Sequence, residues 1–187
     1  MYYQPVLKNA SVADKEVVKI LLGKHNSWPK FTIAIDASAS IPPGLIKLML
    51  GRIKAIMKNI PNFTLRVWCY DTKVYTETEF IASNINDITN LTIQGNGGTD
   101  ADCIWKYLEK NGVRPDRLIV ITDGYDSYKE EYSEYCPTLF MLHTDSKIPF
   151  NNIPFGETVH YKYGQSFWNK ICNAVNRMRF TLRCFFE

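Results

Sequence analysis

The sequence predicts an α/β fold, a three-layer, doubly wound, Rossmann-like domain with a mostly parallel central sheet and an antiparallel edge strand. Short apolar runs alternate with segments whose apolar residues recur at helical spacing, which favours alternating strands and helices. The runs at 117–122 and 138–144 are almost continuously apolar, as is typical of parallel strands covered on both faces. The runs at 63–70 and 73–80 are separated only by Asp71 and Thr72 and predict a hairpin, which supplies the antiparallel strand.

The predicted elements follow one another as strand, helix, two strands, helix and two strands. The first helix begins at Pro43, a residue suited to a first helical turn, and the second ends at Gly112, a residue that stops helices well. The expected strands lie at 31–35, 63–70, 73–80, 117–122 and 138–144, the expected helices at 43–59 and 101–112, and a last edge strand within 157–163.

One compact domain is expected from 187 residues, of which 45% are hydrophobic, with no internal repeat. We assign residues 31–187 to this domain and residues 1–30 to an N-terminal extension, with a short helix over 12–24, that packs on it. Residues 166–187 predict an amphipathic helix with Phe167 and Ile171 on its apolar face. We expect this helix to close the domain, although a basic amphipathic helix also suits a membrane surface or a partner's groove.

Composition and charge exclude several classes of function. The 22 Lys and Arg residues against 19 Asp and Glu residues give a net charge of +3 without a basic stripe, which argues against nucleic acid as a partner. The N-terminus lacks a signal-peptide pattern, and no apolar run approaches the roughly 20 residues of a membrane span. The protein is therefore expected in the cytoplasm.

The cysteines and histidines do not form a recognisable site. The five cysteines are too widely spaced for a zinc site or disulfide framework, and His25, His143 and His160 are too dispersed for a catalytic set.

Three oxygen-rich loops each follow or adjoin a predicted strand. They are DASAS at 36–40, GNGGTD at 95–100 and TDGYD at 122–126. Taken singly, each suits an ordinary turn or the beginning of a helix. Because ligands of such folds bind outside the carboxyl ends of the strands, we expect the three loops to converge there. The converging side chains are Asp36, Ser38, Ser40, Thr99 and Asp123.

The chemistry of this set predicts a divalent cation. All five side chains offer hard oxygen donors, with no sulfur or imidazole, which favours Mg²⁺ or Mn²⁺, with Ca²⁺ as a further candidate, and argues against zinc and copper. Mg²⁺ takes about six oxygens and gives up its water reluctantly, so an open position should remain for an external ligand. A phosphate-binding P-loop is not predicted, because no Lys follows the glycines.

These motifs resemble those of the von Willebrand factor A (VWA) domain. DASAS is similar to the D-x-S-x-S of its metal-ion-dependent adhesion site (MIDAS), Thr99 to the distant threonine and Asp123 to the final aspartate. The resemblance implies that the serines and the threonine contact the metal directly, and that the aspartates act through water. It also implies that an Asp or Glu of a partner protein completes the coordination.

Over residues 31–145 the sequence more closely resembles the VWA-like domain that ends bacterial metallopeptidase-like proteins. The peptidase-like half is not expected here, because only about thirty residues precede the first strand and the chain has no H-E-x-x-H helix. Many intracellular VWA proteins act beside MoxR-type AAA+ ATPases, so the resemblance implies such a partner. Ala39 stands where many relatives have glycine, a change that leaves every oxygen donor in place.

We therefore expect a metal-dependent protein-binding module and not an enzyme. One alternative is a haloacid-dehalogenase-like phosphotransferase with Asp36 as its nucleophile, although Ser38 leaves no acid to protonate a leaving group. The second alternative is a structural protein, such as a virion component, that retains the fold without using metal. The neighbouring acids Asp100, Asp102 and Asp126 are expected at the rim of the site, where they tune its charge or cap helices and turns.

Overall fold

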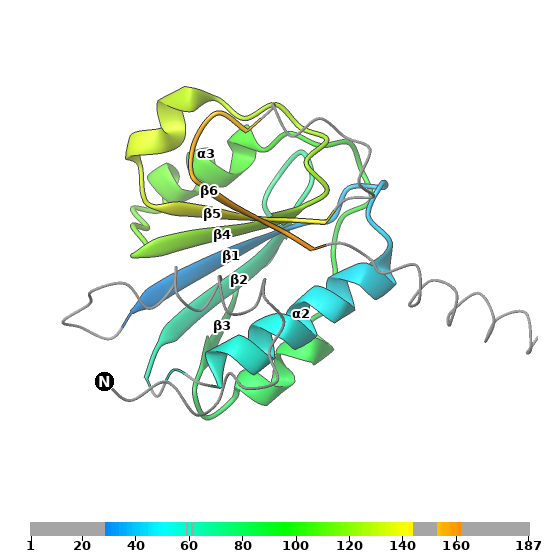
Figure 1. The fold of residues 1–187 in the computed structure, drawn as a ribbon, viewed down its shortest axis with the longest axis vertical. Coiled ribbons are helices and arrows are strands. Elements are labelled where there is room, and N and C mark those ends of the chain that lie inside the picture. Colours follow the sequence, from blue (N-terminus) through cyan, green and yellow to red (C-terminus); the bar gives the residue numbers. More distant parts are fainter. Residues whose placement is uncertain (1–28, 59, 61, 144–152, 162–187) are drawn as a thin grey trace, which may run out of the picture.

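The computed structural model of the chain describes residues 29–58, 60, 62–143 and 153–161 (Figure 1). In this part of the chain, six strands form one sheet in the order β3-β2-β1-β4-β5-β6. Neighbouring strands run parallel except at one edge, where β3 is antiparallel to β2. The predicted fold class is confirmed, including the hairpin that supplies the antiparallel edge.

The helices and strands lie close to their predicted places. Gly112, with φ of +61°, adopts the left-handed conformation that ends the second helix. Two short 3₁₀ helices, η1 and η2, were not predicted. The strands are β1 (Lys30–Asp36), β2 (Thr64–Tyr70), β3 (Thr78–Ile81), β4 (Arg117–Thr122), β5 (Thr138–Leu142) and β6 (Glu157–His160), and the helices are α2 (Pro43–Met57), η1 (Ile85–Asn90), α3 (Asp102–Lys110) and η2 (Glu130–Glu134).

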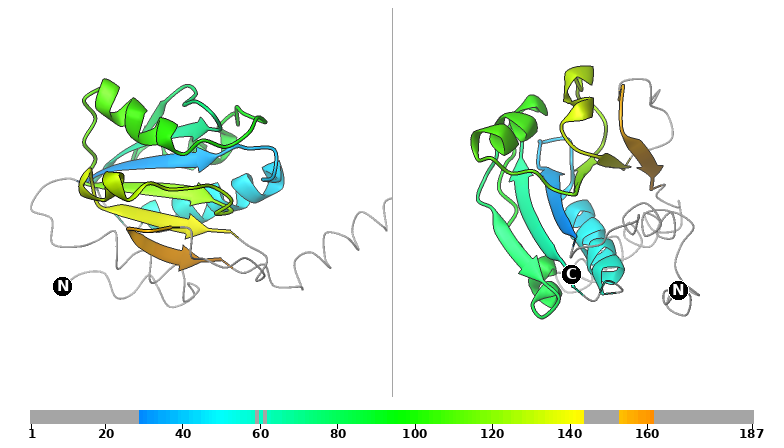
Figure 2. Two further views of the ribbon diagram at one scale, coloured as in Figure 1. Left: turned by 90° about the horizontal axis from the view of Figure 1, so that it is seen from above. Right: turned by 90° about the vertical axis from the view of Figure 1, so that its left-hand side faces the viewer.

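The sheet lies between two helical layers. Helices α2 and α3 cover opposite faces, as Figure 2 shows, with η1 beside α2. Successive strand residues point to opposite faces of the sheet. Ile33 and Ile35 of β1 therefore belong to the hydrophobic core between the sheet and α2, whereas Ala34 belongs to the core between the sheet and α3. Full burial of an aliphatic side chain stabilises a fold by roughly 1.5–3 kcal/mol. Both faces of the central strands therefore contribute to stability, which explains their almost unbroken apolar sequences.

The hairpin strand β3 is shorter than predicted. It begins only at Thr78, and before it the chain touches β2 at the single bridge Tyr70–Val74. The backbone amides of Thr72 and Lys73 donate hydrogen bonds to the Asp71 carboxylate. These bonds bend the chain into a turn where the β-rich composition predicted a continuous strand.

The two predicted terminal helices, over 12–24 and 166–187, lie outside the described residues. The proposed packing of the N-terminal extension on the domain concerns the same undescribed segment. Within the described ranges, no helix has the length and apolar character needed to cross a membrane.

Candidate metal centre

The carboxyl ends of β1 and β4 place Asp36 and Asp123 side by side at one edge of the sheet. The two strands are parallel neighbours, and Ile35 pairs with Ile121, so they end at the same level. Asp36 is the last residue of β1, and Asp123 directly follows β4. The parallel pairing of β1 and β4 thus places Asp36 and Asp123 at the same end of the sheet, as the sequence predicts.

Asp36 is buried and held at both carboxylate oxygens. Only 1% of the residue is exposed. Its Oδ1 accepts a hydrogen bond from the Ser38 backbone N–H at 2.9 Å, and its Oδ2 accepts one from the Thr122 hydroxyl at 2.8 Å. Burial raises the pKa of Asp36 above its ordinary value, the nearby Asp123 carboxylate raises it further, and the bonds from Ser38 and Thr122 oppose the rise. A cation at this edge would relieve the repulsion between the two acids.

The hydroxyls of Ser38 and Ser40 lie together beside Asp36. Their Oγ atoms are 3.1 Å apart, which is within hydrogen-bond distance. Ser38 is buried, whereas Ala39 and Ser40 are exposed. The D-x-S-x-S spacing therefore produces a pair of hydroxyl oxygens at the surface end of a buried carboxylate.

The glycine-rich loop packs against the DASAS loop. The Ala39 backbone N–H donates to the Gly97 carbonyl oxygen at 3.2 Å. A Cβ on Gly95 would lie 2.6 Å from the Cβ of Ala37, so only glycine allows the two loops to approach this closely. Thr99, in the same loop, is half-buried and makes no hydrogen bond to the other four predicted ligands. Backbone contacts thus bring its loop to the site, but its side chain is not hydrogen-bonded to the rest of the set.

The loop after β4 holds Asp123 through its own backbone. Asp123 is 9% exposed, and its Oδ1 accepts a hydrogen bond from the Tyr125 N–H at 3.1 Å. Gly124, with φ of +83°, allows the turn between them. The Asp123 carboxylate lies at the base of this turn, while the Tyr125 side chain is 65% exposed at its tip.

Thr122 is a residue of the candidate site that the sequence analysis did not single out. Besides donating to Asp36, its hydroxyl accepts hydrogen bonds from the Gly124 N–H at 3.0 Å and the Tyr128 hydroxyl at 3.3 Å. It therefore ties the Asp36 carboxylate to the loop that carries Asp123. The sequence gives no signal of this role, because β-branched residues such as threonine are common in strands whatever their contacts.

Asp71 is a second residue that the sequence analysis did not single out as part of the site. It directly follows β2, next to Tyr70, which pairs with Asp36 at the end of β1, and only 3% of it is exposed. Burial raises its pKa, but hydrogen bonds from the Tyr75 hydroxyl and from backbone amides, including that of Gly97, outweigh burial and hold the pKa below its ordinary value. Asp71 is thus ionised at neutral pH, and the signal that could have found it is the acid after a second parallel strand.

The acids at the rim organise the beginning of α3. Asp126 accepts a hydrogen bond from the Ala101 N–H at 2.6 Å, and Asp100 accepts one from the Asp102 N–H at 3.1 Å. Asp102 forms ion pairs with Lys129 and, at 3.6 Å, with Lys106. Asp100 and Asp126 thus bind backbone amides at the beginning of α3, although Ala101 is its N-cap residue and receives no side-chain cap, whereas Asp102 pairs with two lysines.

The described cysteines are poor nucleophiles. Cys69 and Cys136 are buried and Cys103 is partly buried. Burial raises the pKa of Cys103 to about 12 and that of Cys136 to about 11, so both thiols remain protonated at neutral pH.

Among the described residues, no group of three or more His, Cys, Asp or Glu side chains is arranged to hold a metal. A metal at the sheet edge would therefore depend on hydroxyl oxygens as well as carboxylates.

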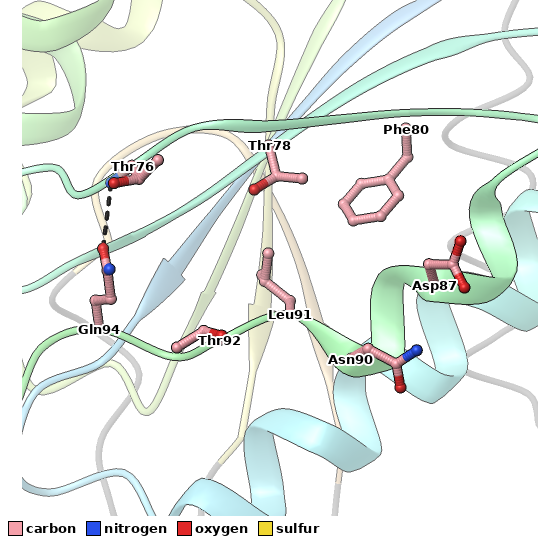
Figure 3. Close-up of a pocket in the computed structure, with 8 residues that line it drawn as sticks. All are labelled: Thr76, Thr78, Phe80, Asp87, Asn90, Leu91, Thr92 and Gln94. Carbon is pink, nitrogen blue, oxygen red and sulfur yellow. Dashed lines mark hydrogen bonds between the residues drawn. The ribbon is translucent and has the colours of Figure 1, made fainter.

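A groove of about 350 Å³ lies beside the edge strand β3 (Figure 3). It runs between β3 and the segment 91–94, with Phe80 and Leu91 among its walls. At one end the Thr76 N–H donates to the Gln94 side chain at 3.4 Å. Asp87, Asn90 and Thr92 of its lining are exposed, and none of the five predicted ligands lines it. We therefore place the candidate site not in this groove but at the carboxyl ends of the central strands β1 and β4.

Comparisons with known proteins agree with this fold. The family described as "VWA-like domain (DUF2201)" matches residues 31–162, more than half of the chain. A crystal structure of the conserved hypothetical protein BatB from Bacteroides thetaiotaomicron is 14% identical, with a TM-score of 0.54 over 81% of this chain and 98% of that one. An aerotolerance-related membrane protein from Bacteroides fragilis is also 14% identical, with a TM-score of 0.51 over 80% and 99% of the two chains.

No curated protein matches the sequence. At 14% identity the two solved structures show a shared fold and nothing finer. The family match begins at the second residue of β1 and extends past the end of β6, so it includes both α-helices, α2 and α3. The chain belongs to the family of VWA-like domains.

Proposed function

We propose that this protein is a divalent-metal-dependent protein-binding module. A Mg²⁺ or Mn²⁺ ion would be held by Asp36, Ser38, Ser40, Thr99 and Asp123, and it would bind an Asp or Glu carboxylate of a partner. The observation that carries the proposal is the pair of hydroxyls, with Oγ atoms 3.1 Å apart, beside the buried Asp36 carboxylate. Paired hydroxyls and carboxylates are the hard donors that these ions prefer.

The exposure of the loops supports capture of a partner. Asp36 and Asp123 together balance the charge of a divalent ion, so a partner's carboxylate would bind by direct coordination at the position that the ion leaves open. Ser40 and Ala39 are exposed, which leaves the outer side of the loop open to a partner. Docking would exclude water and strengthen the attraction between the ion and the partner's carboxylate.

The burial of Asp36 argues against the phosphotransferase alternative. A nucleophilic carboxylate must reach phosphorus, yet Asp36 is 1% exposed and both of its oxygens accept hydrogen bonds. The same features suit an acid that orients a hydroxyl or a water molecule beside a metal. Within this proposal, a MoxR-type AAA+ ATPase is a candidate partner, on the strength of the sequence resemblance alone.

Calorimetric titration with Mn²⁺ and Mg²⁺ tests the metal site. We expect the wild-type protein to bind one ion and Asp36→Ala, Asp123→Ala and a double Ser38→Ala/Ser40→Ala variant to bind at least about tenfold more weakly. Asp87→Ala is the matched control, because it removes an exposed carboxylate that lies in η1. Equal heats for the wild type and the site variants would overturn the proposal.

The partner claim needs a separate experiment. A protein captured from the source cell by immobilised wild type in Mg²⁺ should be released by chelator and restored by added Mg²⁺, and Ser38→Ala should fail to capture it. Replacing the contacted Asp or Glu of that protein by Asn or Gln should have the same effect as chelator. A complex indifferent to both treatments would favour a structural role.

A further inference from the structure

Asp71 holds the glycine-rich loop on both sides of Thr99. Its Oδ2 accepts a hydrogen bond from the Gly97 N–H at 3.1 Å, and its backbone carbonyl accepts one from the Asp100 N–H at 2.9 Å. Thr99 lies between these two anchored amides in the sequence. The Gly97 carbonyl in turn accepts the Ala39 N–H, so the same short segment is held against the DASAS loop.

The contact between Asp71 and the loop leaves no room for a side chain at position 97. A Cβ on Gly97 would lie 2.9 Å from Asp71 Oδ2 and 3.4 Å from its Cγ. A Cβ on Gly98 would meet only the Thr72 Cγ2 atom, at an ordinary 3.8 Å. Two adjacent glycines therefore differ in what they allow, and only Gly97 is required by the approach to Asp71.

The two carboxylate oxygens of Asp71 have separate partners. Oδ1 accepts the backbone amides of Thr72 and Lys73, which form the turn after β2. Oδ2 accepts the Tyr75 hydroxyl at 2.8 Å and the Gly97 amide. One oxygen thus stabilises the local turn, and the other reaches a loop 26 residues further along the chain.

We propose that Asp71 is a positioning residue for the metal centre, which fixes the glycine-rich loop where the Thr99 hydroxyl reaches an ion held by Asp36, Ser38 and Ser40. This inference rests on the proposed function. A loop with glycine at positions 95, 97 and 98 loses much backbone entropy when it is ordered. Asp71 orders it before the ion arrives, so less of the binding free energy is spent on the loop.

Asp71→Asn separates the two roles of the carboxylate. The remaining oxygen can still accept the turn amides, whereas the new NH₂ group would face the Gly97 N–H, and two donors cannot bond. Tyr75→Phe is the matched control, because it removes the other partner of Oδ2 and leaves the Gly97 bond. Removal of a group that orients a metal ligand typically lowers metal affinity roughly ten to a hundredfold.

Titration with Mn²⁺ is the first test. We expect Asp71→Asn to bind Mn²⁺ at least about tenfold more weakly than wild type, and Tyr75→Phe to remain within about twofold. Because Asp71 acts through Thr99, combining Asp71→Asn with Thr99→Val should weaken binding no further than either change alone. Wild-type affinity in Asp71→Asn, or fully additive losses in the double variant, would overturn the inference.

A second pair of variants covers the case in which Asp71→Asn does not fold. Gly97→Ala should weaken Mn²⁺ binding as Asp71→Asn does, because its Cβ would push the loop away from Oδ2, whereas Gly98→Ala should bind like wild type. Equal affinities of these two variants would also count against the positioning role.

Amide hydrogen exchange in the metal-free protein tests the loop independently of any ion. The Gly97 and Asp100 amides should exchange slowly in wild type and Tyr75→Phe and faster in Gly97→Ala and Asp71→Asn. If wild type binds no Mn²⁺, the proposed function fails, whereas unchanged exchange at both amides refutes the hold of Asp71 on the loop whatever the metal result.

Discussion

His143 shows how one buried side chain at the site edge links the fold to pH. It follows β5, its backbone N–H donates to the Thr122 carbonyl at 2.9 Å, and it is 6% exposed. The pKa of His143 is lowered to about 4, mainly by burial and also by the positive charge of Arg52, while a backbone hydrogen bond and the Asp123 carboxylate oppose the shift. The imidazole is therefore neutral in the folded protein at physiological pH.

The lowered pKa of His143 predicts a loss of stability on acidification. Between the ordinary pKa of 6.5 and about pH 4, the unfolded chain binds a proton that the folded protein excludes, so stability falls as pH falls through this window. At about pH 4.5 the loss is on the order of 2–3 kcal/mol. His143→Gln should lose correspondingly less between pH 7 and 4.5, as measured by urea unfolding. Identical pH dependence of the two proteins would contradict the assignment.

Sequence patterns predict candidate ligands that share a short motif or follow a strand, but they do not predict the side-chain contacts that join distant segments. Asp36, Ser38 and Ser40 lie within one short motif, and their grouping follows from the end of a single strand. Thr122 reaches Asp36 across 86 residues, and Asp71 reaches Gly97 across 26. Such pairings depend on strand order and loop packing, which periodicity does not specify.

The 3₁₀ helix η2 owes its place to aromatic packing against α3. The rings of Tyr132 in η2 and Trp105 in α3 stack with centroids 4.8 Å apart and an interplanar angle of 7°. Tyr128, just before η2, packs edge-on against Phe140 of β5. The sequence of η2 has little helical periodicity of its own, so this element could not be predicted without its tertiary contacts. The amphipathic α2 and α3, in contrast, carry their own pattern.

Truncation of the stacked ring should loosen this layer. Tyr132→Ala is expected to reduce the free energy of unfolding by about 3 kcal/mol, because a buried aromatic ring is lost and a cavity remains against Trp105. The neighbouring Glu131→Ala, at an exposed position, should change it by less than about 0.5 kcal/mol. Chemical denaturation measures both values, and equal small effects would show that the stack contributes little.

The fold as a whole followed from the alternation of strands and helices, whereas its details depended on packing. Almost continuous apolar runs predicted the central parallel strands, and all residues of β5 are buried. The beginning of β3 was misplaced because the turn at Asp71 replaces a ladder that composition alone favours. The strands of the sheet could therefore be predicted from the sequence, but the contacts that the loops make with one another could not.

A cation bound at this edge should stabilise the whole domain. A ligand at about 100 times its dissociation constant raises the free energy of unfolding by about 2.7 kcal/mol when only the folded state binds it. For a chain of this size that corresponds to a rise in melting temperature of roughly 5–10 °C. Thermal scans with saturating Mg²⁺ should show this rise in wild type, its reversal by chelator and its absence in Asp123→Ala. A wild-type melting temperature insensitive to Mg²⁺ would contradict it.

The hydrogen bond between Asp36 and Thr122 can form only late in the synthesis of the chain. Asp36 is synthesised 86 residues before the hydroxyl that holds it, and it lies on the strand that β4 must join. During synthesis, β1 and then β2 emerge before β4, and the place of β4 beside β1 stays unfilled until residue 122 has left the ribosome. Non-local parallel pairing of this kind forms slowly and exposes apolar strand edges meanwhile. A nascent chain halted before β4 should therefore need a chaperone more than the finished protein does.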